Sequence, residues 1–431
     1  MSTTGDTPGD GDAGDGGGDG DAGGGDPDAV VVGAGPVGMS AALALDARGV
    51  SVAILEAESA DRERPGTRAD YIHGSTLEIL EAVHPGLGER IVDDGLMLPK
   101  RRTCWRGREV YAQTFPVPDD PDELDGLPHS TRIPQPVIED YQHDALADRG
   151  IPIHWDSPVE TVESSESGVR LETKDGETWA VPYVVGADGA GSTVRTELGI
   201  GMSGSQSENT FLIVDVDEAP ENPREPELTF HYGHPDVDGR NVLTAPFQGG
   251  WRVDLTLRTD DDVEAMTSDE RVAELVAATL GERYADQVAW VTTYQFKHVT
   301  ADRMADEHHR VLLAGDSAHL LAPFGGRGMN SGIHDADLAA WAIAGALDAD
   351  TRDLARRDVK NYARIREAAA EWNTSAAKQA FDHIHSDRLS TKAKKWAAAQ
   401  LGRVWEPAGE WLDKAHFGPH GSPPTATIGK F

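Results

Sequence analysis

The stretch AVVVGAGPVGMSAALALDARGVSVAILE, residues 29–56, decides which fold we expect for this chain. Its first four apolar residues predict a buried strand, and the glycine-rich turn leads into an apolar segment of helical character at 39–45. A second apolar run at 52–55 ends in Glu56. Strand, glycine turn, helix and strand form a βαβ unit, which predicts an α/β domain with a Rossmann-like sheet.

The glycines of this turn have the spacing of a dinucleotide-binding site. Gly33 permits a tight turn, Gly35 lets the backbone approach a pyrophosphate, and Gly38 lets helix and strand pack closely. Glu56 is placed to accept hydrogen bonds from a ribose. A purely structural turn is the alternative, which the flanking strands and Glu56 disfavour. The motif does not distinguish FAD from NAD(P).

Two further motifs place an acidic residue in a glycine-rich turn after an apolar run. GADGAGSTVR, residues 186–195, follows the run at 183–185. GDSAH, residues 315–319, follows the run at 311–314 and continues into PFGGRGMNSG, residues 323–332. Each could be a solvent-facing loop, but two acids at strand ends, with glycines opening a helix, favour a ligand site.

Together, the three motifs resemble the class A flavoprotein aromatic hydroxylases, the group that contains para-hydroxybenzoate hydroxylase and phenol hydroxylases. Residues 323–341 are most similar to hydroxylases of the 3-(3-hydroxyphenyl)propionate type, and the resemblance covers about residues 28 to 370. It implies a Rossmann-like FAD-binding domain with an inserted antiparallel β-sheet substrate domain and a helical C-terminus. It also implies an FAD-dependent monooxygenase that uses NADH or NADPH and O₂ to hydroxylate a small aromatic, typically phenolic, substrate through a flavin hydroperoxide.

The resemblance also assigns cofactor-binding positions. The first turn and Glu56 would bind the ADP half of FAD, Arg68 and Gln135 would lie near the flavin phosphates and ribityl chain, and Asp188–Gly189 would also meet the nicotinamide cofactor. The full set is Gly33, Gly35, Gly38, Glu56, Arg68, Gln135, Asp188, Gly189, Gly315, Asp316, Pro323, Gly325, Gly326, Gly328, Met329 and Asn330. His334 departs from the family pattern, since close relatives often carry arginine there. No metal is implied.

The middle of the chain is expected to form the substrate domain. Trp251, Val253, Leu255 and Leu257 alternate with polar residues, which predicts a half-exposed antiparallel strand, and 269–280 is expected to be a helix. Candidate pocket residues are His231, Tyr232, His234, Trp251, Tyr294 and Pro323. A His or Tyr facing the flavin could take the proton of a phenol, but each candidate is also compatible with a structural role. His319 is interpreted as a positioning residue of the third motif.

The expected domain organisation is discontinuous. Residues 1–27 form an acidic tail expected to be disordered. The FAD-binding domain is expected at 28–100, 131–198 and 297–347, the substrate domain at 101–130 and 199–296, and C-terminal helices at 348–431. From His334 onward the sequence is rich in alanine and expected to be helical.

The formal net charge of −35 has consequences for partners. So negative a field argues against nucleic acid or an anionic membrane as a partner, and it resembles the composition of proteins from salt-loving archaea. Cys104 is the only cysteine, which excludes an internal disulfide, and we expect it to be a small buried side chain. Neither a secretory signal nor a spanning segment is visible, so we expect a cytoplasmic monomer or homodimer.

Two other functions remain open from the sequence. The same fold could serve an FAD-dependent oxidoreductase acting on a non-aromatic or isoprenoid substrate. It could also serve a non-catalytic lipid-binding protein, which the three intact motifs disfavour.

Overall fold

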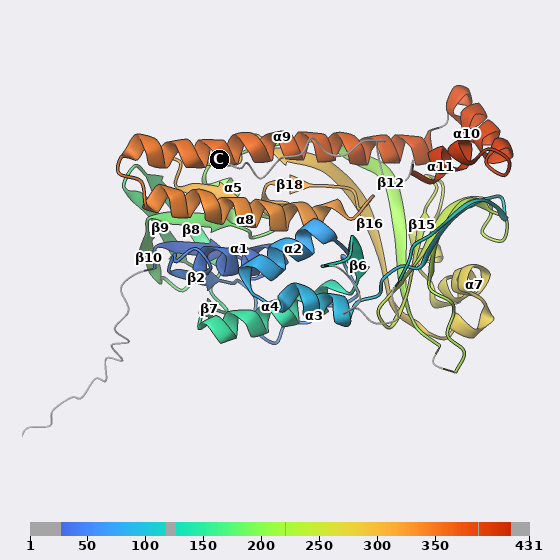
Figure 1. Ribbon diagram of the computed structural model, residues 1–431, viewed down its shortest axis with the longest axis horizontal. Coiled ribbons are helices and arrows are strands. Elements are labelled where there is room, and N and C mark those ends of the chain that lie inside the picture. Colours follow the sequence, from blue (N-terminus) through green and yellow to red (C-terminus); the bar gives the residue numbers. More distant parts are fainter. Residues whose placement is uncertain (1–26, 118–125, 220, 387, 415–431) are drawn as a thin grey trace, which may run out of the picture.

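A computed structural model describes residues 27–117, 126–219, 221–386 and 388–414 (Figure 1). Residues 1–26, most of the tail predicted to be disordered, lie outside this description. Two large sheets, joined by long strands and a long helix, make up the described chain.

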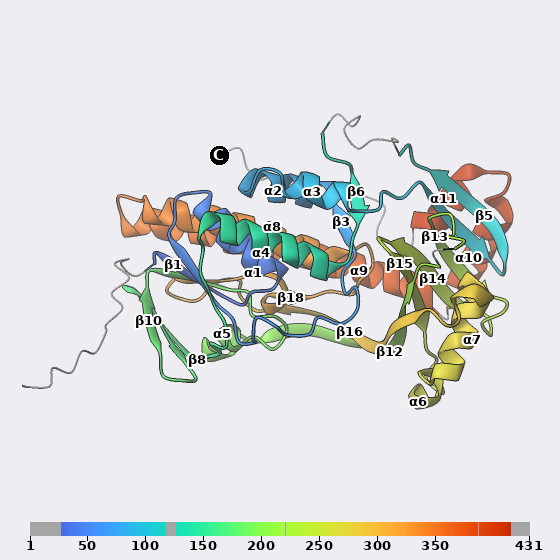
Figure 2. The ribbon, with the colours of Figure 1, turned by 90° about the horizontal axis from the view of Figure 1, so that it is seen from below.

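A five-stranded parallel sheet contains the predicted βαβ unit. Helices lie on one side of it and a small antiparallel sheet on the other, and side chains from both sides form one hydrophobic core (Figure 2). The strands run in the order β17 (Val311–Leu313), β11 (Tyr183–Gly186), β1 (Ala29–Val32), β2 (Val52–Leu55) and β7 (Ile153–His154). The helices are α1 (Pro36–Asp46), α4 (Gln135–Arg149) and α8 (Arg327–Leu347), and the small sheet has β10 (Thr178–Val181), β9 (Gly168–Thr173) and β8 (Val159–Ser165).

Strands β9 and β10 form a hairpin that leads into the buried strand β11. Pro182 divides the apolar run at 178–186 into two strands, because proline cannot donate a ladder hydrogen bond. The first of these, β10, pairs antiparallel with β9, whereas β11 joins the parallel sheet beside β1. The run therefore delivers the second glycine-rich motif to the same sheet as the first.

Shorter elements connect the two large sheets. A helix at 74–83 follows a two-stranded sheet. These elements are β3 (Tyr71–His73), β6 (Ser130–Arg132), α2 (Gly74–Val83), α3 (Leu87–Asp93), α5 (Thr193–Glu197) and the 3₁₀ helix η3 (Gly315–Ser317).

The second large sheet has eight strands. Neighbours are antiparallel except β13 and β4, which are parallel. The order is β18 (His319–Leu320), β16 (Val288–Ala301), β12 (Met202–Asp217), β15 (Gly250–Thr256), β14 (Arg240–Phe247), β13 (Glu227–His234), β4 (Lys100–Trp105) and β5 (Arg108–Thr114). Helices α6 (Val263–Met266) and α7 (Asp269–Leu280), with the 3₁₀ helix η2 (Glu282–Tyr284), pack on one face. The bounds of α7 are those predicted.

The antiparallel strand predicted at 251–257 forms, but its polar face is less exposed than predicted. Trp251, Val253 and Leu255 pack toward α7 as the alternation requires. On the opposite face Arg252 is only 9% exposed and Asp254 is partly exposed, with its Oδ1 atom buried. The alternation identified two faces correctly, but the polar face is covered by the loop that precedes β3.

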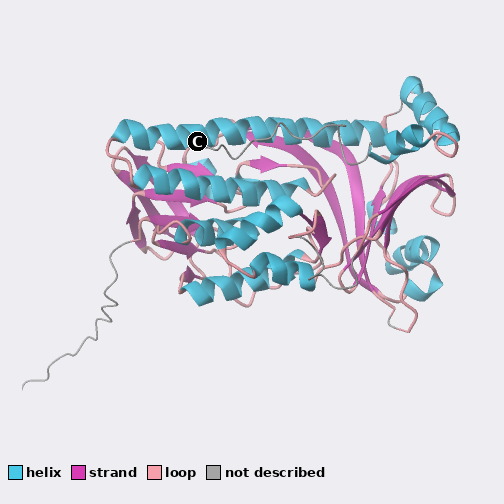
Figure 3. Cartoon of the chain, viewed as in Figure 1, coloured by secondary structure: helices cyan, strands magenta, loops and turns pink. Residues whose placement is uncertain are grey.

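Helices complete the C-terminal part of the described chain (Figure 3). Helix α8 begins at Arg327, earlier than the predicted His334. The 34-residue helix α9 (Arg352–His385) runs the length of the molecule and spans both large sheets (Figure 1). Helices α10 (Leu389–Leu401) and α11 (Glu406–Lys414) then pack at the β5 end of the eight-stranded sheet. None of the described helices is both long and apolar enough to cross a bilayer.

Candidate functional site

The three glycine-rich turns meet at one edge of the parallel sheet, because they follow the neighbouring strands β1, β11 and β17. A Cβ atom added to Gly33 would lie 2.5 Å from the carbonyl oxygen of Ala187 in the second turn. One added to Gly315 in the third turn would lie 3.0 Å from Val37 of the first. Backbones in such close contact form a single structure at the carboxyl edge, where open α/β sheets bind their ligands.

Within the first turn, the glycines serve two different purposes. Gly33 has φ +105°, and a Cβ on Gly38 would lie 1.9 Å from the Gly33 carbonyl oxygen, so both glycines are required by the packing of the chain itself. A Cβ on Gly35 would meet no atom within 4 Å. Gly35 therefore borders open space at the N-terminus of α1, where backbone N–H groups favour an anion such as a pyrophosphate.

Glu56, at the end of β2, is held beside this turn. Its Oε2 accepts a hydrogen bond from the Ala34 N–H (2.5 Å), and its Oε1 accepts one from the Glu58 N–H (2.9 Å). The carboxylate is 9% exposed. Two backbone donors thus fix its orientation next to the open side of Gly35, as a group that receives a ribose hydroxyl requires.

In the second turn, Asp188 is bound within the turn itself. Its Oδ1 accepts from the Ser192 hydroxyl (2.5 Å) and its Oδ2 from the Val194 N–H (3.0 Å), so the carboxylate stabilises the start of α5. Desolvation raises the pKa of Asp188, against the hydrogen bonds that lower it. Arg195 donates to the Ser317 carbonyl (3.0 Å) and so ties the second turn to the third.

In the third turn, three buried side chains hold the backbone in place. His319 Nε2 lies 2.7 Å from Asp335 Oδ2, which also accepts from the Gly315 N–H (2.9 Å), while Arg366 of α9 pairs with the other carboxylate oxygen. These partners hold the pKa of Asp335 at about 2 although desolvation opposes them. His319 is thus a positioning residue, as expected. The contribution of Arg366 was not predicted, since only the fold brings it to residue 335.

Asp316 in this turn makes no side-chain hydrogen bond to the described residues, and its side chain is exposed. Desolvation by the surrounding protein nevertheless raises its pKa, with His319 opposing the rise. An accessible carboxyl group enclosed by protein is the expected environment of a residue that lines a ligand site.

The turn before α8 is built from two left-handed glycines, Gly325 (φ +78°) and Gly326 (φ +64°). Asn330 clamps this turn: its Nδ2 donates to the Gly326 carbonyl (2.6 Å) and to the Tyr71 carbonyl (2.7 Å), and its Oδ1 accepts from the His73 N–H (2.9 Å). The first turn of α8 follows at once. A Cβ on Gly328 there would meet nothing within 4 Å, so this helix N-terminus also borders open space, whereas Met329 is buried in the core.

His334, the departure from the family pattern, lies further along α8. Its Nε2 is 3.2 Å from the Ser75 hydroxyl of α2. Desolvation, with Arg366 adding to it, lowers the pKa of His334 to about 4. The side chain is therefore neutral at pH 7, where an arginine would be charged.

Arg68 and Gln135 lie on one small structure at the other side of the site. Arg68 has φ +51°, an uncommon conformation for a residue with a side chain, and its side chain is exposed. The Gln135 N–H donates to the carbonyls of Thr67 (3.1 Å) and Ala69 (2.9 Å), and its side-chain amide donates to Glu139 (2.7 Å). The start of α4 therefore fixes the loop that presents Arg68.

A buried charge network from the eight-stranded sheet supports this loop. Arg252 donates to the Arg68 carbonyl (2.5 Å), to the Thr67 hydroxyl and to Asp215 (3.0 Å), and Asp215 accepts from the Thr67 N–H (2.7 Å). Asp254 stands beside Arg252 on β15, and its Oδ1 has no partner among the described residues. The sequence analysis missed this network, although the charged positions of the alternating strand were its visible signal.

Aromatic side chains join the turn at 323–326 to the eight-stranded sheet. Phe324 packs edge-on against Phe211 of β12 (6.1 Å between ring centroids) and Phe296 of β16 (6.0 Å). Pro323 is exposed, and Tyr294, which lies 5.1 Å from Phe296, is 46% exposed. Burial raises the pKa of Tyr294, and the nearby carboxylate of Asp316 adds to the rise. Tyr294 thus lies near Asp316 of the third turn.

The other pocket candidates lie elsewhere. Trp251 is in the core beneath α7, and its Nε1 donates to Glu218 (2.8 Å). Tyr232 is buried beneath the C-terminal helices and donates to the Leu412 carbonyl (2.9 Å). The rings of His231 and His234 lie against each other on β13, tilted by 59° with 4.5 Å between their centroids. The structure gives Trp251 and Tyr232 packing partners distant from the glycine turns.

Comparison with known proteins now adds to this geometry. Residues 26–376 match the model of a family described as FAD binding domain. The chain belongs to this FAD-binding family. FAD is accordingly the cofactor for which the open edge of the parallel sheet is built: the space at Gly35 and Gly328, the fixed carboxylate of Glu56 and the exposed Asp316 fit an extended dinucleotide.

Curated relatives of this FAD-binding chain are longer proteins. It is 31% identical over 334 residues to a 6-methylpretetramide 4-monooxygenase of Streptomyces rimosus, covering 75% of this chain and 57% of the relative. It is 29% identical over 351 residues to a 3-(3-hydroxy-phenyl)propionate/3-hydroxycinnamic acid hydroxylase of Mycolicibacterium smegmatis, covering 76% and 58%. A dialkyldecalin synthase of Streptomyces rugosporus is 27% identical, covering 74% and 65%. The chain thus spans less than two thirds of the length of these relatives.

Solved structures show the same fold. The p-nitrophenol 4-monooxygenase of Pseudomonas putida superimposes with a TM-score of 0.73 at 23% identity, covering 92% of this chain and 99% of that one. A complex of aklavinone-11 hydroxylase with FAD and aklavinone superimposes with a TM-score of 0.68 at 21% identity, covering 84% and 70%. The expected architecture, a Rossmann-like domain with an inserted antiparallel sheet and a helical C-terminus, is confirmed.

Proposed function

We propose that this chain is an FAD-dependent monooxygenase that hydroxylates a small aromatic, phenolic substrate with NADH or NADPH and O₂. The observation that carries the proposal is that Asp316 of the third glycine-rich turn lies close enough to Tyr294 of β16 to raise its pKa, while Phe324 packs against Phe296 of the same strand, so the cofactor edge of the parallel sheet meets an aromatic face of the eight-stranded sheet. Hydroxylases among the relatives, and a phenolic substrate in the name of one of them, support it.

The predicted cofactor contacts follow from this arrangement. The first turn and Glu56 would hold the ADP half, and Arg68, Gln135 and Asp316 would hold the middle of FAD. The rest of the bound FAD would lie beside Gly189, Gly315 and the turn at 323–330. Bound FAD would supply electron transfer from NAD(P)H and the activation of O₂.

The protein's own contribution is position and electrostatics. The N-terminus of α8, preceded by two left-handed glycines, directs backbone N–H groups into the open space and favours negative charge there. The cluster of Phe211, Phe296 and Phe324 provides an apolar wall that excludes water from one side. The ring of Tyr294 lies 5.1 Å from that of Phe296 in this wall, and we assign its hydroxyl group the binding of a phenolic hydroxyl group.

The test is a substrate screen on the purified full chain loaded with FAD. Hydroxylated benzoates, phenylpropionates and phenols are added while NADH or NADPH loss and product mass are followed. We expect an aromatic compound to stimulate NAD(P)H oxidation and to gain one oxygen atom from ¹⁸O₂ and none from H₂¹⁸O. Stimulation by a prenyl or alicyclic compound alone would favour a different oxidoreductase. Conversion of a substrate with no NAD(P)H consumed would refute the monooxygenase proposal.

A further inference from the structure

Helix α10 and the turn after it carry an unusual set of exposed apolar side chains. Leu389 is 85% exposed, Val404 84%, Trp396 59% and Trp405 57%, and Leu401 is also exposed. Isolated exposed apolar residues are ordinary on protein surfaces, but two tryptophans and three aliphatic side chains within 389–405 form a contiguous candidate binding site. We call these five residues, with the exposed basic residues between them, the α10 surface.

The charge of this segment is opposite to that of the molecule. Residues 388–405 contain five basic and no acidic residues, in a chain with a net charge of −35. One of the five, Lys395, is buried and donates to the Ile384 carbonyl (3.1 Å). Arg388, Lys392, Lys394 and Arg403 remain exposed. The α10 surface is therefore both apolar and positively charged.

Helix α10 has a buried inner face and an exposed outer face. Its inner face, with Ala398 and Ala399, packs into the hydrophobic cluster beneath it. Leu389, Ala393 and Trp396 are spaced by four and three residues, so they share the outer face. Lys392 and Lys394 stand on either side of this apolar line.

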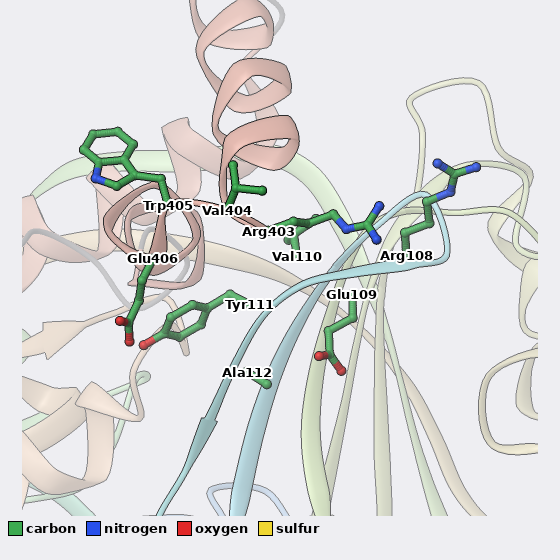
Figure 4. A pocket seen from close by; sticks show the side chains of 10 residues that line it. Arg108, Glu109, Val110, Tyr111, Ala112, Arg403, Val404, Trp405 and Glu406 are labelled. Atoms are coloured by element: carbon green, nitrogen blue, oxygen red, sulfur yellow. The ribbon is translucent and has the colours of Figure 1, made fainter.

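The turn after α10 continues the surface next to β5. A cavity of about 950 Å³ separates the turn from β5, and its lining includes Arg108, Arg403 and Trp405 together with the acidic Glu109 and Glu406 (Figure 4). Figure 4 shows Arg403, Val404 and Trp405 on the turn, and Arg108 extending from the neighbouring β5.

We propose that the α10 surface binds a membrane that contains anionic phospholipids. A basic helix with exposed tryptophan and leucine lies in the plane of the lipid headgroups, where the apolar side chains insert and the cations meet phosphates. A second copy of this chain docked symmetrically would bring basic residues against basic residues, and interfaces between proteins are depleted of lysine.

The net charge of the whole chain does not prevent this binding. Helix α10 lies at one end of the molecule (Figure 1), and charges act over only roughly 8 Å at physiological salt, so a bilayer bound there meets mainly the charges of this end. The local charge of the α10 surface then decides the interaction. This inference is independent of the reaction proposed above.

Vesicle flotation with the full chain tests the proposal. Vesicles of phosphatidylglycerol and phosphatidylcholine are compared with vesicles of phosphatidylcholine alone. We expect binding to the first kind only. Lys392→Gln with Lys394→Gln should lower the partition coefficient roughly 10- to 30-fold, at about 1 kcal/mol for each cation. Leu389→Ser with Trp396→Ser and Trp405→Ser should abolish flotation.

Matched controls outside the surface are Lys360→Gln and Leu354→Ser, two exposed positions on α9. Circular dichroism checks that each variant is folded, and the exposure of the replaced side chains makes unfolding unexpected. Equal binding to both kinds of vesicle, no binding, or equal loss in the control variants overturns the proposal. A dimer detected by light scattering, abolished by the tryptophan substitutions while no vesicle floats, would show that a second copy occupies this surface instead.

Discussion

Asp254 lies on the polar face of β15 among the charges of Arg252, Asp70 and Asp215. Desolvation raises the pKa of Asp254 to about 7, Arg252 opposes the rise, and the two aspartates add to it. The native state therefore holds a proton that the unfolded chain releases near pH 4. The stabilising effect of this protonation is fully present below about pH 4 and is lost as the pH rises through about 7.

Replacing Asp254 with asparagine should remove this dependence. We expect Asp254→Asn to have a higher free energy of unfolding than the wild type at pH 8, by about 2–4 kcal/mol, and to approach the wild type at pH 5. The lower end of this range allows for the partial exposure of Asp254, because solvent screens the charges around it. Urea denaturation at both pH values measures the difference. The same difference at pH 5 and pH 8 would contradict the raised pKa.

The side chain of Asp316 makes no hydrogen bond to the described residues, so its replacement should leave the fold intact and weaken ligand binding. We expect Asp316→Ala to bind FAD about tenfold or more weakly, because a hydrogen bond to a charged group contributes about 1.5–3 kcal/mol. Flavin released on denaturation and flavin titration of the apoprotein measure the change. A matched loss of melting temperature in the FAD-free protein would instead indicate a structural role.

Two glycines of the turn between β1 and α1 have different roles: Gly38 is needed for the packing of the turn, and Gly35 leaves space for the ligand. A Cβ on Gly38 would lie 1.9 Å from a backbone oxygen, so Gly38→Ala should destabilise the FAD-free chain by about 3 kcal/mol or more. A Cβ on Gly35 meets nothing within 4 Å, so Gly35→Ala should cost less than about 1 kcal/mol. It should nevertheless weaken FAD binding, since the methyl group occupies the space left for the pyrophosphate. Equal stability of the two variants in urea would refute this distinction.

At the scale of the whole molecule, the net charge of −35 generates repulsion within the folded state. Salt shortens the range of this repulsion from about 10 Å at 0.1 M to about 3 Å at 1 M. We therefore expect the melting temperature to rise steeply between low salt and molar KCl. A melting temperature that is constant over this range would rule out the interpretation that the chain is adapted to salt. Sodium sulfate and KCl should be compared at equal ionic strength, because sulfate also strengthens apolar burial.

The sequence by itself determined the parts of this protein that depend on neighbouring residues. The glycine turns, the strands before them and the bounds of α7 follow from spacing and alternation, which act over a few residues. Three turns at the ends of buried strands were enough to indicate a ligand site, because parallel strands bring their carboxyl ends to one edge. The resemblance of these motifs to class A flavoprotein hydroxylases then indicated FAD as the ligand.

Only the tertiary structure decided what covers each face and which distant charges meet. The alternation in β15 distinguished two faces but could not show that the polar one lies against the loop carrying Arg68. Arg252 and Asp215, like Arg366 and Asp335, come from separate elements, so no local pattern pairs them. Burial of such charges is tolerated only where a partner stands within hydrogen-bond distance, and that proximity is a property of the folded chain.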